Sequence, residues 1–261
     1  MDIKRIKNNI GTDFIGQNIL YLDTVNSTNL YAKKIAKENT HGTLIISEEQ
    51  TAGKGRLGKN WTSNFGEGIW MTIILKPEIK IQNAPFLTLV AGAAVAKSLN
   101  SLGLEALIKW PNDITLNNKK ICGILTELSA ENESVSYIVL GMGINVNTLN
   151  FDKEISAKAT SILKEGYKID REIIILNILE EFEKIYKNYV NACDKHETLA
   201  LNRRFSAIIG KNVYIIESGV RKLKICLDIN EDGNLLVQDE DGSITEVNSG
   251  EVSVRGEGGY V

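Results

Sequence analysis

Early in the chain, a glycine-rich and cationic stretch has residue types that suit the binding of an anion. Residues 53–58 read Gly-Lys-Gly-Arg-Leu-Gly, and Lys59 follows directly. Glycines let the backbone approach a ligand closely, and their amides can form a concave anion site. Lys54, Arg56 and Lys59 add positive charge, and Trp61 stands where it could cover a bound group. The stretch predicts a phosphate or carboxylate site, with a solvated flexible loop or a nonspecific nucleic-acid patch as the alternative.

The same glycines match the GxGxxG pattern of dinucleotide-binding proteins, but their context excludes that interpretation. A dinucleotide-binding turn must open a helix, whose N-terminal amides hold the pyrophosphate. Here the glycines lead through a polar segment into the β-rich run 69–75. A P-loop is excluded as well, because no Gly-Lys-Ser/Thr ending follows at the required spacing.

A second candidate motif, Lys-Trp-Pro-Asn-Asp at residues 109–113, leaves the end of an expected strand. Pro111 fixes its own φ and biases Trp110 toward an extended conformation. Three polar groups of different character therefore meet at a strand end, which is a common place for ligand sites. An ordinary Asn-Asp turn is the alternative interpretation.

Two glycine-containing strands carry the remaining candidates. Lys120 opens the apolar run 121–125, and the glycine inside that run, Gly123, indicates a close approach to the backbone. The run Gly-Met-Gly-Ile-Asn at 141–145 repeats this signal and would leave room for a flat ligand. The alternative for Lys120 is a surface lysine whose aliphatic chain packs on apolar residues. The alternative for the glycines of 141–145 is tight packing of the sheet.

Composition limits the class of protein in which these motifs work. The 261 residues are 43% hydrophobic with a formal net charge of −3, which allows a sizeable core and argues against nucleic-acid binding by the whole surface. The uncharged stretch 85–96 is shorter than the roughly 20 residues that span a bilayer, and the N-terminus lacks an apolar signal core. Three cysteines without a CxxC pair predict reduced thiols in the cytoplasm, and two histidines without a cysteine cluster do not suggest zinc.

Hydrophobic periodicity predicts the elements that would position these motifs. Residues 48–68 have no apolar period and read as a long loop, and loops of that length are usually functional or disordered. After about residue 208 the pattern changes to short strands separated by Asp-Gly pairs, which suit tight hairpins and predict a small antiparallel barrel over 209–255. Earlier in the chain we expect helices at 28–38, 86–102 and 170–189, and strands at 43–47, 69–75, 106–109, 121–128 and 137–147.

Taken in order, the motifs resemble those of biotin protein ligases over nearly the whole chain, from about Tyr21 to Arg255. Family members often have arginine where this chain has Lys54. The resemblance implies an α+β fold: a mixed sheet with flanking helices, like that of class II aminoacyl-tRNA synthetases, in a catalytic domain at 1–205, and a small SH3-like β-barrel at 206–261. The matching segments are 27–29 (STN), 50–61 (QTAGKGRLGKNW), 109–113 (KWPND), 120–125 (KICGIL), 141–145 (GMGIN), 159–161 (ATS) and 250–255 (GEVSVR).

Some members of this family carry an N-terminal DNA-binding helix-turn-helix and act as repressors. Only about twenty residues precede the matching region here, which is too few for three helices of about 11 residues each. We therefore expect the form without that domain, with no nucleic-acid partner and no membrane partner. The resemblance also leaves room for a homodimer.

The resemblance implies a two-step ligase reaction. The carboxylate of biotin attacks the α-phosphate of Mg-ATP, giving biotinyl-5′-AMP and pyrophosphate, and a lysine of a biotin carboxyl carrier protein domain then receives the acyl group in a new C–N bond. The expected ligands are thus ATP, biotin and Mg²⁺, with the metal carried by ATP. Arg56, Lys120 and Asp113 are the expected catalytic residues: the cations hold the carboxylate and phosphate, and Asp113 orients the incoming lysine or accepts its proton.

The resemblance also assigns residues to each ligand. Trp110 would wall the pocket, Glu251 would close over the nucleotide from the barrel, and segment 148–158 would become ordered with the adenylate. The residues expected at biotin are Ser27, Thr28, Asn29, Gln50, Gly53, Lys54, Gly55, Arg56, Trp61, Lys120 and Gly123. Those expected at the nucleotide are Arg56, Lys59, Trp61, Asn112, Lys120, Asn145, Ala159 and Arg255.

Three rival functions remain open. A lipoate or octanoate ligase or transferase shares the core fold, although the Ser-Thr-Asn motif and the cationic glycine loop favour biotin. A nucleic-acid-binding module would use the 53–59 loop and the barrel, and would bind duplexes in a salt-dependent way. A catalytically silent biotin sensor is disfavoured because Lys120 and Asp113 are both intact.

Overall fold

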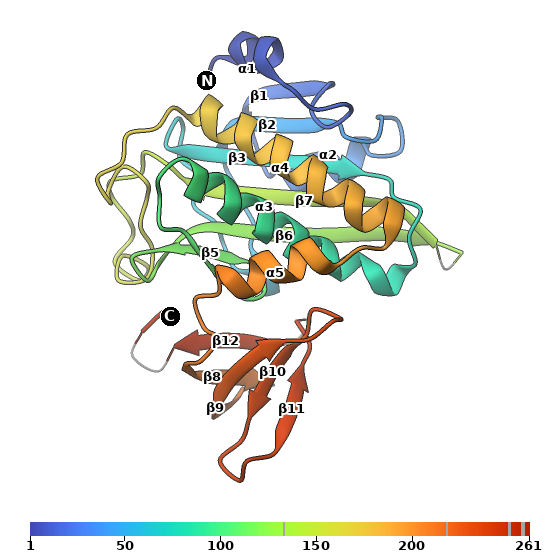
Figure 1. The fold of residues 1–261 in the computed structure, drawn as a ribbon. Coiled ribbons are helices and arrows are strands. Elements are labelled where there is room, and N and C mark those ends of the chain that lie inside the picture. Colours follow the sequence, from blue (N-terminus) through green and yellow to red (C-terminus); the bar gives the residue numbers. More distant parts are fainter. Residues whose placement is uncertain (133, 218, 250–251, 257–258) are drawn as a thin grey trace.

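The computed structural model describes residues 1–132, 134–217, 219–249, 252–256 and 259–261. A large mixed sheet carries helices on both faces, and a smaller antiparallel sheet packs against one end of this layered domain (Figure 1). The expected α+β architecture with a small C-terminal β domain is confirmed. None of the helices in the described ranges combines the length and apolar character that crossing a bilayer requires.

The large sheet has the strand order β1-β2-β3-β7-β6-β5-β4. β1 and β2 pair in parallel, and the other neighbours pair antiparallel. The strands are β1 (Ile19–Val25), β2 (Leu44–Gln50), β3 (Gly68–Leu75), β4 (Leu107–Lys109), β5 (Asp113–Leu116), β6 (Lys119–Glu131) and β7 (Ser134–Asn145).

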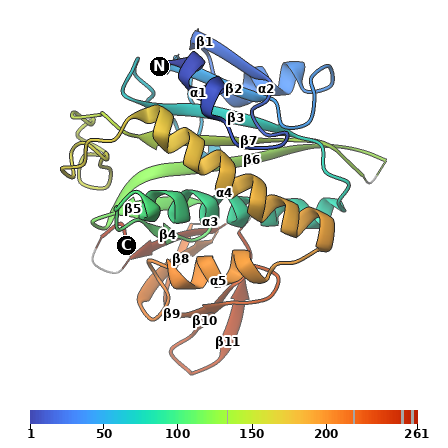
Figure 2. The same ribbon diagram turned by 45° about the horizontal axis from the view of Figure 1, so that its top comes forward.

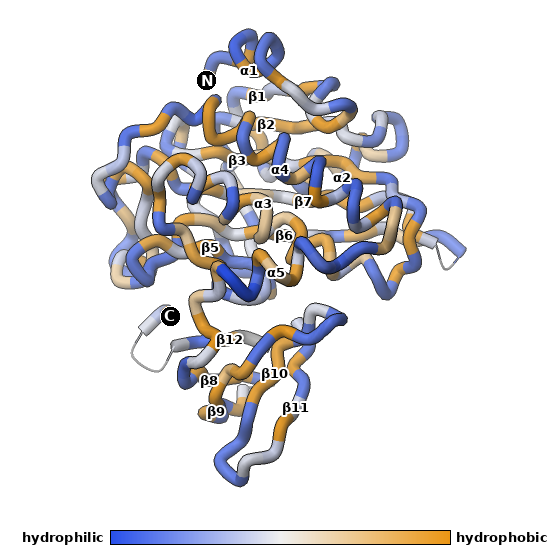
Figure 3. The backbone as a smooth tube through the Cα atoms, in the orientation of Figure 1, coloured by the Kyte–Doolittle hydropathy of each residue, from blue (hydrophilic) through white to orange (hydrophobic). Residues whose placement is uncertain are grey.

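Helices cover the two faces of this sheet unequally (Figure 2). α3 (Leu87–Ser101) and α4 (Arg171–Ala192) lie on one face, with α5 (His196–Arg204) beside α3 and α1 (Ile3–Asn9) against α4, whereas α2 (Thr28–Ile35) covers the other face. Alternate strand residues supply the two layers: Ile45, Ile74 and Val139 pack with α2, and their neighbours pack under α3 and α4. In Figure 3 the hydrophobic colour concentrates on β2 and β3 and alternates along α4, as a helix with one buried face requires.

The smaller sheet has the order β11-β10-β9-β8-β12, formed by β8 (Asn212–Glu217), β9 (Val220–Ile229), β10 (Leu235–Gln238), β11 (Ile244–Val247) and β12 (Val252–Gly256). Its β9–β10 turn docks on the large domain, where Trp110 Nε1 donates to the Gly233 carbonyl at 3.0 Å. The linker before β8 pairs with β4, since Ile108 N donates to the Phe205 carbonyl at 2.7 Å. The two sheets are therefore held together by both backbone and side-chain hydrogen bonds.

The described elements differ from the expected ones in a few places. The sequence pattern does not predict α1, β1, β5 or α5, and α2 ends at Ile35 rather than at residue 38. The segment expected as a structureless loop at 48–68 continues β2 to Gln50 and contains the 3-10 turn η1 (Arg56–Gly58). A second 3-10 helix, η2 (Ile81–Phe86), leads into α3.

Candidate active site

A row of residues paired across four strands forms the floor of the site. Gly143 of β7 faces Gly123 of β6, Gly123 faces Asp113 of β5, and Asp113 faces Lys109 of β4. Residues paired in this way project to the same face of a sheet. The row therefore passes from two positions without side chains to a carboxylate and then to an ammonium group.

The indole of Trp61 occupies the space that the two glycines leave. A Cβ at Gly143 would lie 2.6 Å from Trp61 Nε1, and one at Gly123 would lie 3.1 Å from Trp61 Cζ3. The cationic loop carries this ring across the sheet and closes on itself, because Trp61 N donates to the Gly53 carbonyl at 2.9 Å. A Cβ at Gly53 would overlap the Trp61 carbonyl. These glycines are thus explained by the close approach of the chain's own tryptophan.

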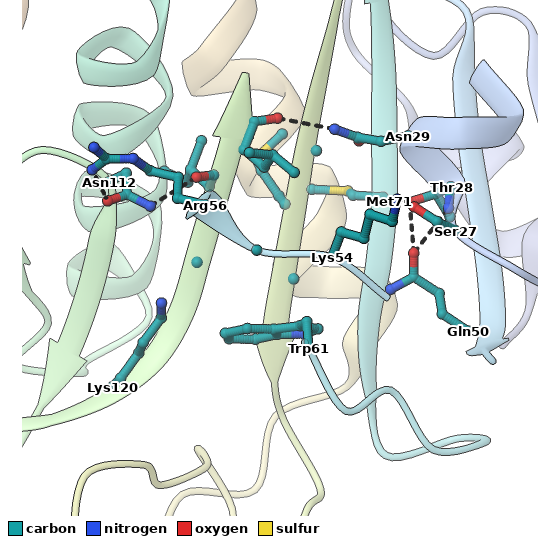
Figure 4. Close-up of a pocket in the computed structure, with 17 residues that line it drawn as sticks. Ser27, Thr28, Asn29, Gln50, Lys54, Arg56, Trp61, Met71, Asn112 and Lys120 are labelled. Carbon is teal, nitrogen blue, oxygen red and sulfur yellow. Dashed lines mark hydrogen bonds between the residues drawn. The ribbon is translucent and has the colours of Figure 1, made fainter. Parts of the chain in front are cut away.

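A cavity opens between this loop and the sheet (Figure 4). Its empty volume is about 440 Å³, with open solvent at the mouth included. Of the predicted site residues, the cavity lining brings together Ser27, Thr28, Asn29, Gln50, Lys54, Gly55, Arg56, Trp61, Asn112, Lys120 and Gly123. It adds Met71, Ile124, Leu125, Gly141, Met142 and Gly143.

One end of the cavity is polar and preorganised by the start of α2. Ser27 caps this helix, and the Thr28 amide donates to Gln50 Oε1 at 2.8 Å. The Thr28 hydroxyl reaches the same oxygen at 3.1 Å, while Gln50 Nε2 donates to Ser63 Oγ at 2.8 Å. Figure 4 shows Trp61 between this polar group and Lys120. Donors and acceptors are therefore fixed at one end of the cavity.

Asn29 is held from two sides by residues that the sequence motifs do not include. Thr72 of β3 donates to Asn29 Oδ1 at 2.6 Å, and Asn29 Nδ2 donates to Glu127 Oε2 at 2.9 Å. A Cβ at Gly141 would overlap the Asn29 amide, so that glycine is also a packing requirement. In the sequence, Thr72 stands out as a hydroxyl residue within the apolar strand β3. Glu127 has no local sequence feature that marks it as a partner of Asn29.

The other end of the cavity is charged. Lys120 Nζ lies 2.5 Å from Asp113 Oδ1 and 5.0 Å from the centre of the Trp61 ring. The register between β5 and β6 shifts next to this lysine, and such a bulge re-aims a side chain, which puts Lys120 on the face of Asp113. Burial alone would raise the pKa of the Asp113 carboxyl, but the Lys120 ammonium and the Tyr260 hydroxyl outweigh burial and lower that pKa.

Arg56 connects the glycine loop to the 109–113 motif and to the barrel. Its Nη1 donates to Asn112 Oδ1 at 2.9 Å, and its Nη2 donates to the Ser249 carbonyl. Asn112 is itself fixed, since its Nδ2 donates to the Ile124 carbonyl at 2.9 Å. Burial lowers the pKa of the Arg56 guanidinium, partly opposed by Asp113. Arg56 and Lys120 therefore reach one cavity from different segments of the chain.

Further cations surround the charged end without lining the cavity. Burial and then the charges of Arg255 and Lys120 lower the pKa of Lys59. Burial and then Arg255 lower the pKa of Lys109 to about 7. The site thus carries more positive than negative charge, which suits an anionic ligand with several charges.

Several expected site residues lie elsewhere. Trp110 is only 2% exposed and docks the barrel turn through its Nε1, so the expectation that it walls the cavity is wrong. Asn145 donates to the Thr160 carbonyl at 3.1 Å, and Ala159 pairs with Lys120. These two residues hold the segment after β7 beside Lys120 rather than lining the cavity. Glu251 lies outside the described residues.

The arrangement favours charge stabilisation over covalent catalysis. Cys122 is close to Lys120 in sequence, but burial raises the pKa of its thiol, and a buried protonated thiol is a poor nucleophile. Within the described ranges, no group of three or more His, Cys, Asp or Glu side chains could hold a metal ion. The chemistry available to these side chains is the binding and orientation of anionic reactants.

Comparisons with known proteins agree with this geometry. Residues 21–145 match the biotin/lipoate A/B protein ligase family, and residues 208–255 match the biotin protein ligase C-terminal domain. The chain is 38% identical over 242 residues to the "Bifunctional ligase/repressor BirA" of Bacillus spizizenii, covering 91% of this chain and 74% of the relative. It is 32% identical to the "Biotin--[acetyl-CoA-carboxylase] ligase" of Mycobacterium tuberculosis, covering 87% and 85%. A solved biotin protein ligase from Aquifex aeolicus, in complex with biotin and ATP, superposes with a TM-score of 0.80 at 28% identity, covering 92% of this chain and all of that chain.

Proposed function

The chain belongs to the biotin protein ligase family, and we propose that it activates biotin with ATP as biotinyl-5′-AMP and transfers the biotinyl group to a lysine of a biotin carboxyl carrier protein domain. The observation that carries this proposal is the convergence of Arg56 and Lys120 on a cavity whose far end is polar and internally hydrogen-bonded. Solved relatives that contain biotin and ATP support the choice of ligands.

The polar end of the cavity suits the ureido ring of biotin. Such a ring presents one carbonyl acceptor and two N–H donors on an otherwise apolar body. Thr28 and Asn29 offer hydroxyl and amide groups whose orientation is fixed by Gln50 and Thr72. A buried ligand gains specificity from a few polar groups placed this way among apolar walls, which Met71 and Leu125 contribute here.

The first step forms an anhydride between two anions. The biotin carboxylate oxygen attacks the α-phosphorus of ATP, the bond from that phosphorus to the bridging oxygen breaks, and pyrophosphate leaves. Lys120 and Arg56 would hold the carboxylate and the α-phosphate together, so that their repulsion is offset as charge builds on the phosphate oxygens. Mg²⁺ enters with the triphosphate as part of the substrate Mg-ATP.

The second step transfers the acyl group to an amine. The lysine nitrogen of the carrier attacks the anhydride carbonyl carbon, and the bond from that carbon to the phosphate oxygen breaks. AMP leaves as the anion, and the proton that the amine loses passes to solvent. Asp113 forms an ion pair with Lys120. Because the pKa of its carboxyl is lowered, the carboxylate is a weak base at neutral pH. Asp113 therefore orients the incoming amine by charge rather than accepting its proton.

The test measures the two steps separately. Lys120→Ala should lower biotin-dependent ATP–pyrophosphate exchange on the order of 10²–10³-fold, because a donor aimed at developing charge is lost. Asp113→Asn should slow transfer from preformed biotinyl-5′-AMP to a carrier domain more than it slows exchange. The matched control is Lys119→Ala, the preceding lysine of β6, whose side chain alternates to the opposite face.

Exchange at the wild-type rate in Lys120→Ala would remove Lys120 from the first step. Exchange that responds to lipoic acid or octanoate but not to biotin would redirect the proposal to the lipoate branch of the matched family.

A further inference from the structure

Lys109 is a buried cation that the steps above do not use. It is 1% exposed at the end of β4, next to Asp113 in the cross-strand row. Among the described residues, no hydrogen-bond acceptor reaches its Nζ. A buried ammonium group without an acceptor is costly to the fold, so its retention beside the reaction centre points to a ligand that supplies the missing acceptor.

The face of Lys109 that a ligand would meet is covered by Tyr260. The Lys109 Nζ lies 3.4 Å from the centre of the Tyr260 ring, in a cation–π contact. The Tyr260 hydroxyl donates to Asp113 Oδ2, the carboxylate oxygen that Lys120 does not occupy. In Figure 1 the C-terminal end of the chain lies between β12 and β5, so the tail reaches the row from the barrel side. One aromatic side chain thus caps both the free cation and its neighbouring anion.

The groups around Lys109 define the kind of ligand that would replace this ring. The strongest charges acting on Lys109 come from Arg255, Asp113, Lys120 and Lys59, and all but Asp113 are cations. An aromatic ring offers weak, delocalised negative charge, whereas a polyphosphate offers several full charges and oxygen acceptors. A polyphosphate therefore fits this cluster better than the ring that covers it.

We propose that Lys109 binds the polyphosphate part of the nucleotide and that Tyr260 is its intramolecular cover, which the polyphosphate displaces. This inference rests on the proposed function for the identity of the anion. Displacement of Tyr260 also releases Asp113 Oδ2 from its hydrogen bond for as long as the polyphosphate is bound.

The test titrates the full-length chain with inorganic pyrophosphate by calorimetry. Tyr260→Ala should lower the Kd for pyrophosphate about tenfold, because apparent affinity scales with the fraction of molecules in the uncovered state. Tyr260→Phe keeps the ring over Lys109 and loses the hydrogen bond to Asp113, so it should give a smaller gain. Lys109→Met should raise the Kd about tenfold or more, and adding Tyr260→Ala to that variant should bring back almost none of the affinity.

The matched control is Tyr137→Ala, which removes a half-buried tyrosine of β7 whose hydroxyl donates to the Lys33 carbonyl at 3.5 Å, far along the strand from the site. Its Kd for pyrophosphate should equal that of the wild type. An unchanged or higher Kd in Tyr260→Ala would overturn the proposal, because Tyr260 would then be neutral or would itself contribute to binding.

A second measurement on the wild type does not depend on any variant. Hydrogen–deuterium exchange in the peptide that contains residues 252–261 should increase when pyrophosphate is added, because displacement frees the tail. Slower or unchanged exchange would contradict displacement. Because neither measurement uses biotin, a chain that shows both effects but no biotin-dependent exchange of ATP and pyrophosphate would refute the proposed function and leave this inference standing.

Discussion

Gly143 is where the site depends most directly on a missing side chain. An added Cβ would lie 2.6 Å from Trp61 Nε1 and 2.8 Å from Trp61 Cε2, well inside van der Waals contact, and β7 is hydrogen-bonded to β3 on one side and to β6 on the other. Gly143→Ala should therefore push the indole off the sheet floor and weaken biotin binding about tenfold or more, a loss of ~1.4 kcal/mol for each factor of ten. Calorimetric titration with biotin measures the effect.

Gly92→Ala is the matched control for this substitution. Gly92 lies inside α3, and the nearest atom to an added Cβ there is 3.9 Å away, an ordinary contact. Alanine is favoured over glycine in a helix by about 1 kcal/mol, so this variant should bind biotin like the wild type and melt at the same or a higher temperature. Wild-type biotin affinity in Gly143→Ala would mean that Trp61 has no role in closing the cavity.

Lys109 should also leave a signature in the pH dependence of stability. Burial, and then Arg255, lower its folded-state pKa to about 7, whereas an unfolded lysine titrates near about 10.4. Between these values the unfolded chain binds more protons than the folded chain, so the wild type gains stability as pH rises through this window. Below about pH 7 the Lys109 ammonium is charged in the folded chain as well, so the full free-energy cost of burying that charge remains.

Lys109→Met removes this cost, so it should unfold at higher denaturant concentration than the wild type at pH 6. The difference should be a few kcal/mol at most, since each pKa unit is worth about 1.4 kcal/mol, and it should shrink as the pH approaches 10. Chemical denaturation at several pH values measures it, with Lys119→Met as the control. Parallel stability profiles for Lys109→Met and the wild type would show that Lys109 is not buried as a charge.

Local sequence chemistry predicts which segments meet at the site, but not how individual side chains are used. Arg56, Lys120 and Asn112 are predicted from motifs, and one cavity contains all three. The roles of Trp110 and Tyr260 depend on contacts with residues far away in the chain, Gly233 and Asp113 respectively. No spacing rule reports a contact of that kind. The functional assignments of the individual site residues remain predictions.

At the scale of elements, long periodic segments are predictable and short ones are not. The pattern over 170–189 predicts α4 (Arg171–Ala192), and the run 69–75 predicts most of β3 (Gly68–Leu75). β5 (Asp113–Leu116) is too short for a periodic signal, and β1 (Ile19–Val25) is a half-exposed edge strand. The row of the active site nevertheless depends on β5, because that strand places Asp113 between Gly123 and Lys109.

The glycine loop shows how an element without periodicity can still be ordered. Its composition predicts a structureless anion-binding segment, yet Gln50 pairs with Ser63 and Lys54 pairs with Asn60 in short antiparallel bridges. The Gly55 amide donates to the Lys59 carbonyl at 2.7 Å and tightens the turn. Because these pairings are local, the loop can place Arg56 over the cavity without a helix or a long strand.

At the scale of the molecule, the barrel is part of the charged end of the site. It supplies the Ser249 carbonyl to Arg56, the Arg255 charge that acts on Lys59 and Lys109, and the tail that contains Tyr260. The polar end of the cavity comes entirely from the large domain. Loosening the contact between the two domains should therefore affect the nucleotide and leave biotin binding almost unchanged.

Arg203 is the residue with which to test this division. At the end of α5 it donates to the Ile229 carbonyl, with Nη2 at 2.5 Å, and pairs with Asp228 at 3.0 Å and Glu231 at 3.1 Å. Arg203→Ala should raise the KM for ATP several-fold, keep the biotin affinity within twofold, and lower the free energy of unfolding by about 1–2 kcal/mol through the lost hydrogen bonds.

The adjacent Arg204 supplies the matched control, because it is also a cation in the last turn of α5 but contacts the Phe205 ring rather than the barrel, at 5.3 Å. Arg204→Ala removes the same charge from the helix end, so any effect of the helix dipole cancels between the two variants. Steady-state kinetics over a range of ATP concentrations and calorimetry with biotin separate the two ligands. If Arg203→Ala weakened biotin and ATP equally, the variant would be disturbing the large domain itself, and the barrel would have no separate part in holding the nucleotide.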